Sequence, residues 1–273
     1  MKKIIINFTL LLVVNLVYCQ EQIENAYIKC VYQLTFQPDS TNKNSVLQEE
    51  MLLIIGQTHS LFVASNNYYN DSVVKSHSHL FKIDPALFME QSAIDRKSAP
   101  SFNPYIYKNH QKKEINYMLS MMDNYEYYEP FSQLKWILLP DKEEMLGHVC
   151  QKAKLFYGGR EWEAWFDPEI PIKDGPYTFC GLPGLIVKIQ DTKKYYVFEL
   201  NSITKAPSYY SIYKQDLTTI TLSKCDFFEA QRKYIEGLPA MAMANTLNPD
   251  PEFIKEIEER LKRKNNPIEL KCD

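Results

Sequence analysis

Four carboxylates fall within one short stretch of the chain, Asp167 to Asp191. The acids are Asp167, Glu169, Asp174 and Asp191, and prolines and glycines between them indicate a shaped loop. Paired carboxylates act as general acid and base in glycoside cleavage. Aspartates also cap turns in loops of this kind, so the pattern leaves a hydrolytic site and a structural set both open.

A second candidate for chemistry is Cys150, which has His148 two residues before it. On a strand the two side chains would share one face, and a cysteine nucleophile needs a nearby base. A disulfide or a buried thiol is the alternative, which an exported protein favours. No GxSxG serine motif is present.

Metal-ligating patterns are weak in this sequence. His77 and His79 would converge on a metal only if they lay on a strand, and their segment has the pattern of a helix or loop. The oxygen-rich run typical of a calcium loop is missing. We therefore expect no metal and no cofactor.

Arg160, Trp165, Asp167 and Tyr177 form the expected ligand- or partner-binding set. Trp162 and Trp165 should point to opposite faces of one strand, so that one is core and the other is more exposed. An exposed Trp165 beside Tyr177 could stack on a ligand or partner. The alternative is that a helix from the C-terminal tail covers it.

Gly181-Leu182-Pro183-Gly184 begins the run Gly181 to Ile186. Within it, Leu182 to Leu185 predicts a type II turn, with Pro183 second and Gly184 third at positive φ. The segment Cys150 to Ile203 resembles the GLPGLI family, uncharacterised cell-envelope proteins of Bacteroidetes that are named after this run. Further matching residues are Gly158-Gly159-Arg160, Ala164-Trp165-Phe166, Glu169-Ile170-Pro171, Gly175-Pro176-Tyr177, Asp191 and Asn266-Pro267-Ile268-Glu269-Leu270. The resemblance implies an envelope protein and supplies no catalytic residues.

Residues 1–19 have the pattern of a signal peptide, because Lys2 and Lys3 precede an apolar run too short to span a membrane. Cleavage would leave Gln20 first and place the protein in the periplasm or cell envelope; acylation of Cys19 is the alternative. The remaining 29 basic and 34 acidic residues give a net charge of −5. We expect no nucleic-acid partner and no transmembrane segment in the mature chain.

Five cysteines follow the signal, so at least one cannot pair within the chain. Cys150–Cys180 is the first expected disulfide because both residues flank the same part of the predicted sheet. Cys225–Cys272 is the second, and separate buried thiols are the alternative.

Residues 20–273 are expected to form a single β-rich domain with a helical tail from about residue 225. Period-two patterns predict about ten antiparallel strands in a strongly curved sheet or open barrel, with a β-sandwich as second choice. The strands are Tyr27–Gln37, Val46–Ile55, Ser60–Ala64, Tyr105–Asn109, Ile115–Leu119, Glu126–Tyr128, Leu134–Leu139, Val149–Tyr157, Arg160–Phe166, Leu185–Gln190 and Tyr195–Ile203. Predicted helices are Tyr69–Leu80, Pro85–Asp95, Asp226–Glu236 and Pro251–Lys264.

Together these observations favour an exported, non-catalytic binding or accessory protein whose partner is an apolar ligand, a peptide or an envelope protein. An envelope hydrolase using the carboxylates of residues 167–191 is one alternative. A structural component of an envelope assembly is the other.

Overall fold

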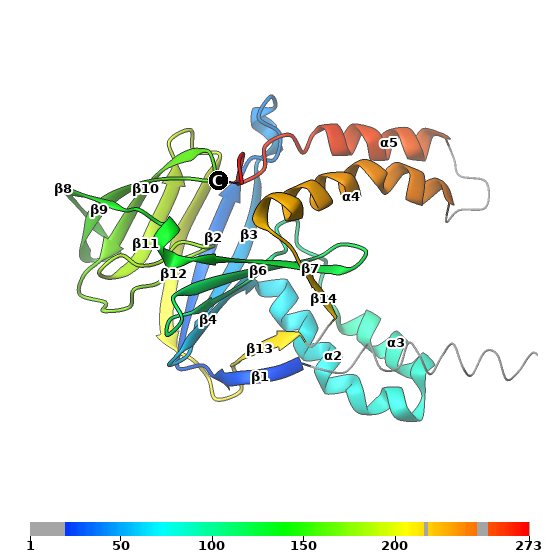
Figure 1. Cartoon of the computed structure of the whole chain (residues 1–273). Helices are drawn as coiled ribbons and strands as arrows, with labels where there is room; N and C mark the ends of the chain where they lie inside the picture. Colours follow the sequence, from blue (N-terminus) through cyan, green and yellow to red (C-terminus); the bar gives the residue numbers. More distant parts are fainter. Residues whose placement is uncertain (1–19, 216–217, 245–250, 273) are drawn as a thin grey trace, which may run out of the picture.

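An open sheet of twelve strands forms the body of the molecule (Figure 1). The computed structural model describes residues 20–215, 218–244 and 251–272, so the expected signal peptide and Cys19 lie outside the described residues. From one edge to the other the strands are β14 (Thr219–Thr221), β7 (Asn124–Pro130), β6 (Glu114–Ser120), β5 (Tyr105–Asn109), β4 (His59–Ala64), β3 (Leu47–Ile55), β2 (Ile28–Phe36), β12 (Tyr196–Lys205), β11 (Leu185–Asp191), β10 (Arg160–Asp167), β9 (His148–Tyr157) and β8 (Ile137–Met145).

Neighbouring strands are antiparallel except β14, which pairs with β7 in parallel. The sheet does not close on itself, because its terminal strands β14 and β8 are not paired with each other. The prediction of a mainly antiparallel, open sheet is therefore confirmed, and the sheet is not closed into a barrel. Short 3₁₀ turns lie at Lys43–Ser45 and Phe131–Gln133.

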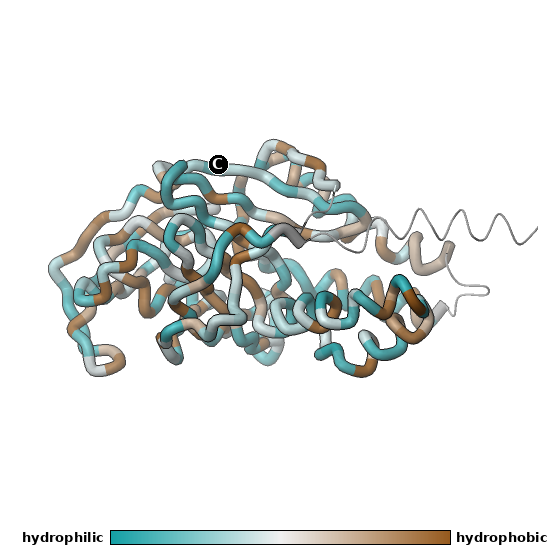
Figure 2. Tube along the Cα trace, turned by 90° about the horizontal axis from the view of Figure 1, so that it is seen from below, coloured by the Kyte–Doolittle hydropathy of each residue, from teal (hydrophilic) through white to brown (hydrophobic). Residues whose placement is uncertain are grey.

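Alternation along the strands places the main core on one face. In β2, Cys30, Tyr32, Leu34 and Phe36 are buried, as their spacing predicts. Figure 2 shows hydrophobic and hydrophilic residues alternating along much of the trace. A second buried cluster lies on the opposite face of β3 to β6, where it includes Ile212 and Tyr213 of β13 (Ser211–Gln215). The middle of the sheet is thus covered on both sides.

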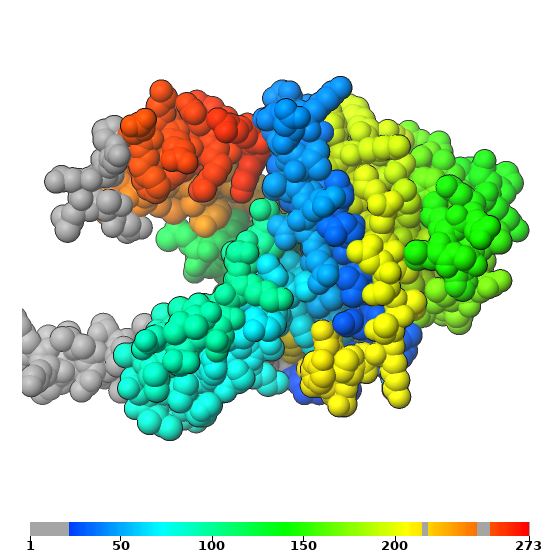
Figure 3. Space-filling view, turned by 180° about the vertical axis from the view of Figure 1, so that it is seen from behind, coloured from blue at the N-terminus to red at the C-terminus, as the bar shows by residue number. Residues whose placement is uncertain are grey.

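Two pairs of helices project from the same end of the sheet (Figure 3). The first is α2 (Ser65–Ile83) with α3 (Pro85–Asp95), and the second is α4 (Lys224–Ala244) with α5 (Pro251–Lys262). Asp84 caps α3, since its Oδ1 accepts hydrogen bonds from the backbone N–H groups of Ala86 and Leu87. Among the described helices, none is long and apolar enough to cross a bilayer.

The structure differs from the prediction in several elements. β8 continues past Pro140, which an edge strand tolerates because one side of its backbone has no partner. Helix α4 continues through Gly237 and Pro239, where the sequence predicted a linker. The prediction missed β14, β13 and β1 (Gln20–Asn25), whose residues are too polar or too few to show a strand pattern.

The disulfide is also different from the first expectation. Cys225 is bonded to Cys272, which was the second choice, whereas Cys150 and Cys180 are free buried thiols. The bond fastens the end of the chain to the first turn of α4. The bond closes a 48-residue loop. By restricting the unfolded chain, such a loop would raise the free energy of unfolding by about 4 kcal/mol at room temperature.

The backbone at the predicted glycine turns agrees with the prediction at one turn and differs at the other. Gly158 and Gly159 both have positive φ, as the two-residue hairpin turn between β9 and β10 predicts. Gly184 does not, so the predicted type II turn was wrong; the positive φ, +91°, belongs to Gly181. Gly184 is needed for space, because a Cβ there would lie 2.1 Å from the backbone oxygen of Asp167.

Replacing Gly184 with alanine should therefore lower the free energy of unfolding by more than about 2 kcal/mol, because the contact is with rigid backbone. Gly147→Ala is the matched control: Gly147 has positive φ, but a Cβ on it would meet nothing within 4 Å. It should cost only about 1 kcal/mol. Urea unfolding of both variants tests this, and equal losses would contradict the close approach as the reason for glycine at position 184.

Candidate functional site

Residues 168–184, the motif loop, connect β10 to β11 and fold into the interior of the sheet. Tyr177, Phe179, Cys180 and Leu182 are buried in the main core. The ring of Phe179 lies 4.7 Å from that of Trp162, centroid to centroid, and the indole N–H of Trp136 donates to the carbonyl of Cys180 at 2.8 Å. The loop therefore fills the inner side of the sheet.

A buried ion pair holds the loop to β5. Lys108, which is fully buried, donates from Nζ to Asp174 Oδ1 at 2.6 Å and to the carbonyls of Gly175 and Phe179 at 2.5 and 3.2 Å. His110 Nε2 lies 3.2 Å from the other carboxylate oxygen. Burial alone would raise the pKa of Asp174, but Lys108 and His110 lower it well below its usual range.

Arg160 binds the chain's own C-terminal segment, residues 265–272. Its guanidinium donates to the carbonyls of Ile268 and Pro267 and to the side-chain oxygen of Asn266, at 2.6–2.8 Å, and pairs with Asp191 at 3.2 Å. Arg160 is therefore buried against this segment and is not exposed at the surface.

The hairpin turn of β9 and β10 makes close contact with the same segment. The Leu270 N–H donates to the Gly158 carbonyl at 2.7 Å, and a Cβ on Gly158 would lie 2.7 Å from the side chain of Glu269. Gly158 and Gly159 thus serve both the turn and the packing of the C-terminal segment.

Two acids and one lysine form a buried cluster that links this segment, through Glu269, to β7 and α4. Lys224 Nζ lies 2.9 Å from Glu129 and 2.7 Å from Glu269. Tyr157 donates to Glu129, and Tyr177 donates to Glu269 at 2.5 Å. Burial raises the pKa of Glu269, and Lys224 offsets the rise only in part because Glu129 adds to it. The sequence reasoning missed this cluster, whose members come from separate elements.

Trp165 and Tyr177 do not form the predicted stacking surface. Trp165 is 8% exposed, with Lys152 and Lys188 ammonium groups 5.0 and 5.8 Å from its ring centroid. The two lysines thus flank an indole that packs into the main core. Tyr177 is part of the aromatic core, where its ring contacts Phe179 and Phe198.

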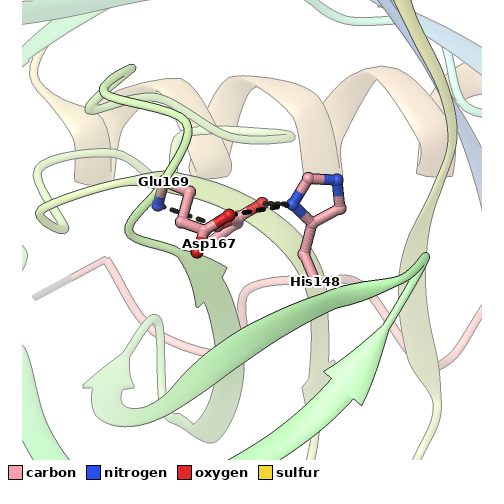
Figure 4. A group of neighbouring side chains, drawn as sticks. All are labelled: His148, Asp167 and Glu169. Carbon is pink, nitrogen blue, oxygen red and sulfur yellow. Dashed lines mark hydrogen bonds and ion pairs between the residues drawn. The ribbon is translucent and has the colours of Figure 1, made fainter.

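Asp167, Glu169 and His148 meet at the open end of the β9–β10 hairpin. His148 Nδ1 lies 3.1 Å from Asp167 Oδ2 and 3.6 Å from Glu169 Oε2. Figure 4 shows both carboxylates converging on the imidazole. Asp167 is buried, whereas His148 and Glu169 are exposed. Their oxygen and nitrogen atoms could hold a metal ion.

The predicted Cys150–His148 nucleophile pair is not formed. The Cys150 thiol points to the backbone carbonyl of His148, at 3.8 Å, rather than to the imidazole. Burial, with a smaller contribution from Asp167, raises the pKa of Cys150 to about 11. A thiol with that pKa is not ionised at neutral pH.

Comparison with known proteins identifies relatives of the fold. Residues 106–188, from β5 into β11, match a family described as "Protein of unknown function (Porph_ging)", which points to a Bacteroidetes family. Two crystal forms of PNGF-II align with TM-scores of 0.52 and 0.51 at 13% and 12% identity, over 77% of this chain and 34% and 33% of theirs. The chain thus spans about a third of PNGF-II. No curated protein matches the chain.

Lys108→Met should lower the free energy of unfolding by about 3–5 kcal/mol at pH 7, because it leaves the Asp174 charge buried without its partner. Lys154→Met is the control, since Lys154 forms exposed pairs with Glu161 and Glu163 and should cost less than about 1 kcal/mol. Equal losses in urea unfolding would show that the buried pair contributes no more than a surface pair.

The same ion pair predicts how the wild-type protein responds to acid. The folded-state pKa of Asp174 is lowered, so its contribution is complete above the unfolded pKa of about 4. That contribution is lost as the pH falls below this value towards the folded pKa. In Lys108→Met the decline of stability in this acid range should be smaller, which unfolding curves between about pH 2 and 5 will measure.

Lys224→Met should leave Glu129 and Glu269 as neighbouring buried carboxylates, and so raise the pKa of Glu269 further. The variant should be strongly destabilised at pH 7. It should recover part of the loss as the pH is lowered towards the unfolded pKa of a glutamate, about 4, because the raised folded-state pKa lets the buried acid bind a proton first. Adding Glu269→Gln should also rescue it. If neither the lower pH nor the second substitution raises the melting temperature of Lys224→Met, repulsion between Glu129 and Glu269 is not the cause of the loss.

Proposed function

We propose that this chain is an exported, non-catalytic binding or accessory protein of the cell envelope, related to the GLPGLI family. The partner we propose is a segment of another envelope protein in an extended conformation. The observation that supports this most directly is the exposed apolar surface beside the edge strand β8.

Ile137 and Phe156 define this surface, with exposed fractions of 64% and 67%. Ile137 lies opposite Lys154 in the β8–β9 ladder, and Phe156 follows Lys154 by two residues, so both side chains share one face. The outer edge of β8 has no partner strand among the described residues. An extended segment could add its backbone to this edge and its apolar side chains to this face.

An apolar ligand held inside the sheet has less support, because the motif loop and its aromatic side chains already occupy that space. A hydrolase using the acids of residues 167–191 also has less support. Asp174 and Asp191 are buried in ion pairs with Lys108 and Arg160, which stabilise the fold and restrict access to substrate. A structural component of an envelope assembly would use the same β8 surface in a permanent contact.

A photo-crosslinking residue placed at Ile137 or at Phe156 should give the same discrete protein adduct in the envelope fraction of the native host. The matched control is Ile94 on α3, which is 66% exposed and far along the chain from β8. Phe156→Glu should abolish the adduct formed from position 137 while leaving the melting temperature unchanged, because the side chain is exposed.

Mass spectrometry of the adducts would identify the partner peptide, which should carry the crosslink on a segment that can extend. Equal labelling from position 94, or no adduct from either β8 position, would refute the surface. N-terminal sequencing of the mature protein tests export separately, and the expected first residue is Gln20.

A further inference from the structure

The three side chains at the open end of the β9–β10 hairpin have the composition of a transition-metal site. We infer that His148, Asp167 and Glu169 bind one Zn²⁺ ion through His148 Nδ1, Asp167 Oδ2 and Glu169 Oε2. This inference does not depend on the proposed function, since a metal here could stabilise the hairpin whether or not β8 binds a partner.

The distances fit a tetrahedral ion. Zinc bonds to nitrogen and carboxylate oxygen of about 2.0–2.2 Å place the ligand atoms roughly 3.3–3.5 Å from one another. Nδ1 of His148 lies 3.1 Å from Asp167 Oδ2 and 3.6 Å from Glu169 Oε2. All three ligand atoms lie within 4.8 Å of one another, so small side-chain rotations would complete the set.

Asp167 provides an independent indication of a cation site. Its Oδ2 is buried and accepts no hydrogen bond from the described residues, although it faces His148. Oδ1 accepts the Glu169 backbone N–H at 2.8 Å, which fixes the carboxylate so that Oδ2 points at the imidazole. Apart from its 3.1 Å contact with His148, which would itself be a ligand, this buried oxygen accepts no hydrogen bond from the described residues, and a bound cation would satisfy it.

The ligand atoms, one imidazole nitrogen and two carboxylate oxygens, favour zinc over calcium and magnesium. Calcium and magnesium prefer sets made of oxygen alone, whereas an imidazole nitrogen with two carboxylates suits zinc. His148 and Glu169 are exposed, so the ion can enter from solvent and keep a water molecule as its fourth ligand. Cys150 is adjacent but lies outside the ligand set.

Titration of the metal-free protein with ZnCl₂ in a calorimeter tests the site. Wild type should bind one Zn²⁺ per chain, with an increase in melting temperature. His148→Ala should weaken binding at least tenfold and Glu169→Gln should weaken it measurably; both side chains are exposed, so the fold should be retained. Substitution with Co²⁺ should give the visible absorption bands of a four-coordinate site.

Two control variants distinguish this site from zinc bound at another histidine or at a thiolate. His77→Ala removes another histidine–aspartate contact, to Asp95 at 3.4 Å, and should bind zinc as wild type does. Cys150→Ser should also bind normally, since no thiolate is needed. The inference is overturned if wild type binds no zinc, which would leave a simple His148–Asp167 ion pair, if His148→Ala binds as tightly as wild type, or if Cys150→Ser abolishes binding.

Discussion

The ion pair between Lys108 and Asp174 is the interaction on which the rest of the structure depends. It joins β5, in one half of the sheet, to the motif loop that follows β10 in the other half. Because Lys108 also donates to two loop carbonyls, these backbone groups are satisfied without water. The loop can then enter the core, where Phe179 and Tyr177 supply the aromatic contacts that a solvated loop would not make. A buried lysine is tolerated there because each charge has its partner.

The hairpin of β9 and β10 is the second organising element. Its turn determines how the C-terminal segment packs at one end of the hairpin and which side chains come together at the other end. On one side the turn leaves room for the C-terminal segment, which Arg160 and the Cys225–Cys272 bond hold in place. The β9–β10 register pairs Arg160 with Tyr157 and Phe166 with Gln151. Continued towards the open end of the hairpin, the same register places residue 169 opposite residue 148. The two glycines therefore control both the closure of the chain's end and the meeting of His148 with the acids.

Local patterns predicted much of this fold because alternation, caps and glycine turns are properties of neighbouring residues. The Gly158–Gly159 turn was predicted, and counting outward from it would have paired His148 with Glu169, so this part of the candidate site was accessible from the sequence. Lys108 and Asp174 were not, because 66 residues separate them and a lysine within a strand usually points to solvent. Lys108 does share the face of buried Ile106, which is the one local sign of its burial. The prediction for Gly184 was wrong because glycine is required both at a positive φ and where another backbone segment packs closely. The sequence alone does not distinguish these two requirements.

The residues that resemble the GLPGLI family, here called the motif, are mostly buried against one another. Gly184 lies against the backbone of Asp167, Gly175 against Ile186, and Gly158 against Glu269. Each contact fits one segment of the chain against another, so the motif specifies how the loop, the hairpin and the C-terminal segment pack. A chain that shares these residues would share this core whatever its activity, since none of these contacts leaves a side chain free for a substrate. Differences of function between such chains would then arise on surfaces outside the motif, such as the exposed face of β8 and β9 and the two projecting helix pairs.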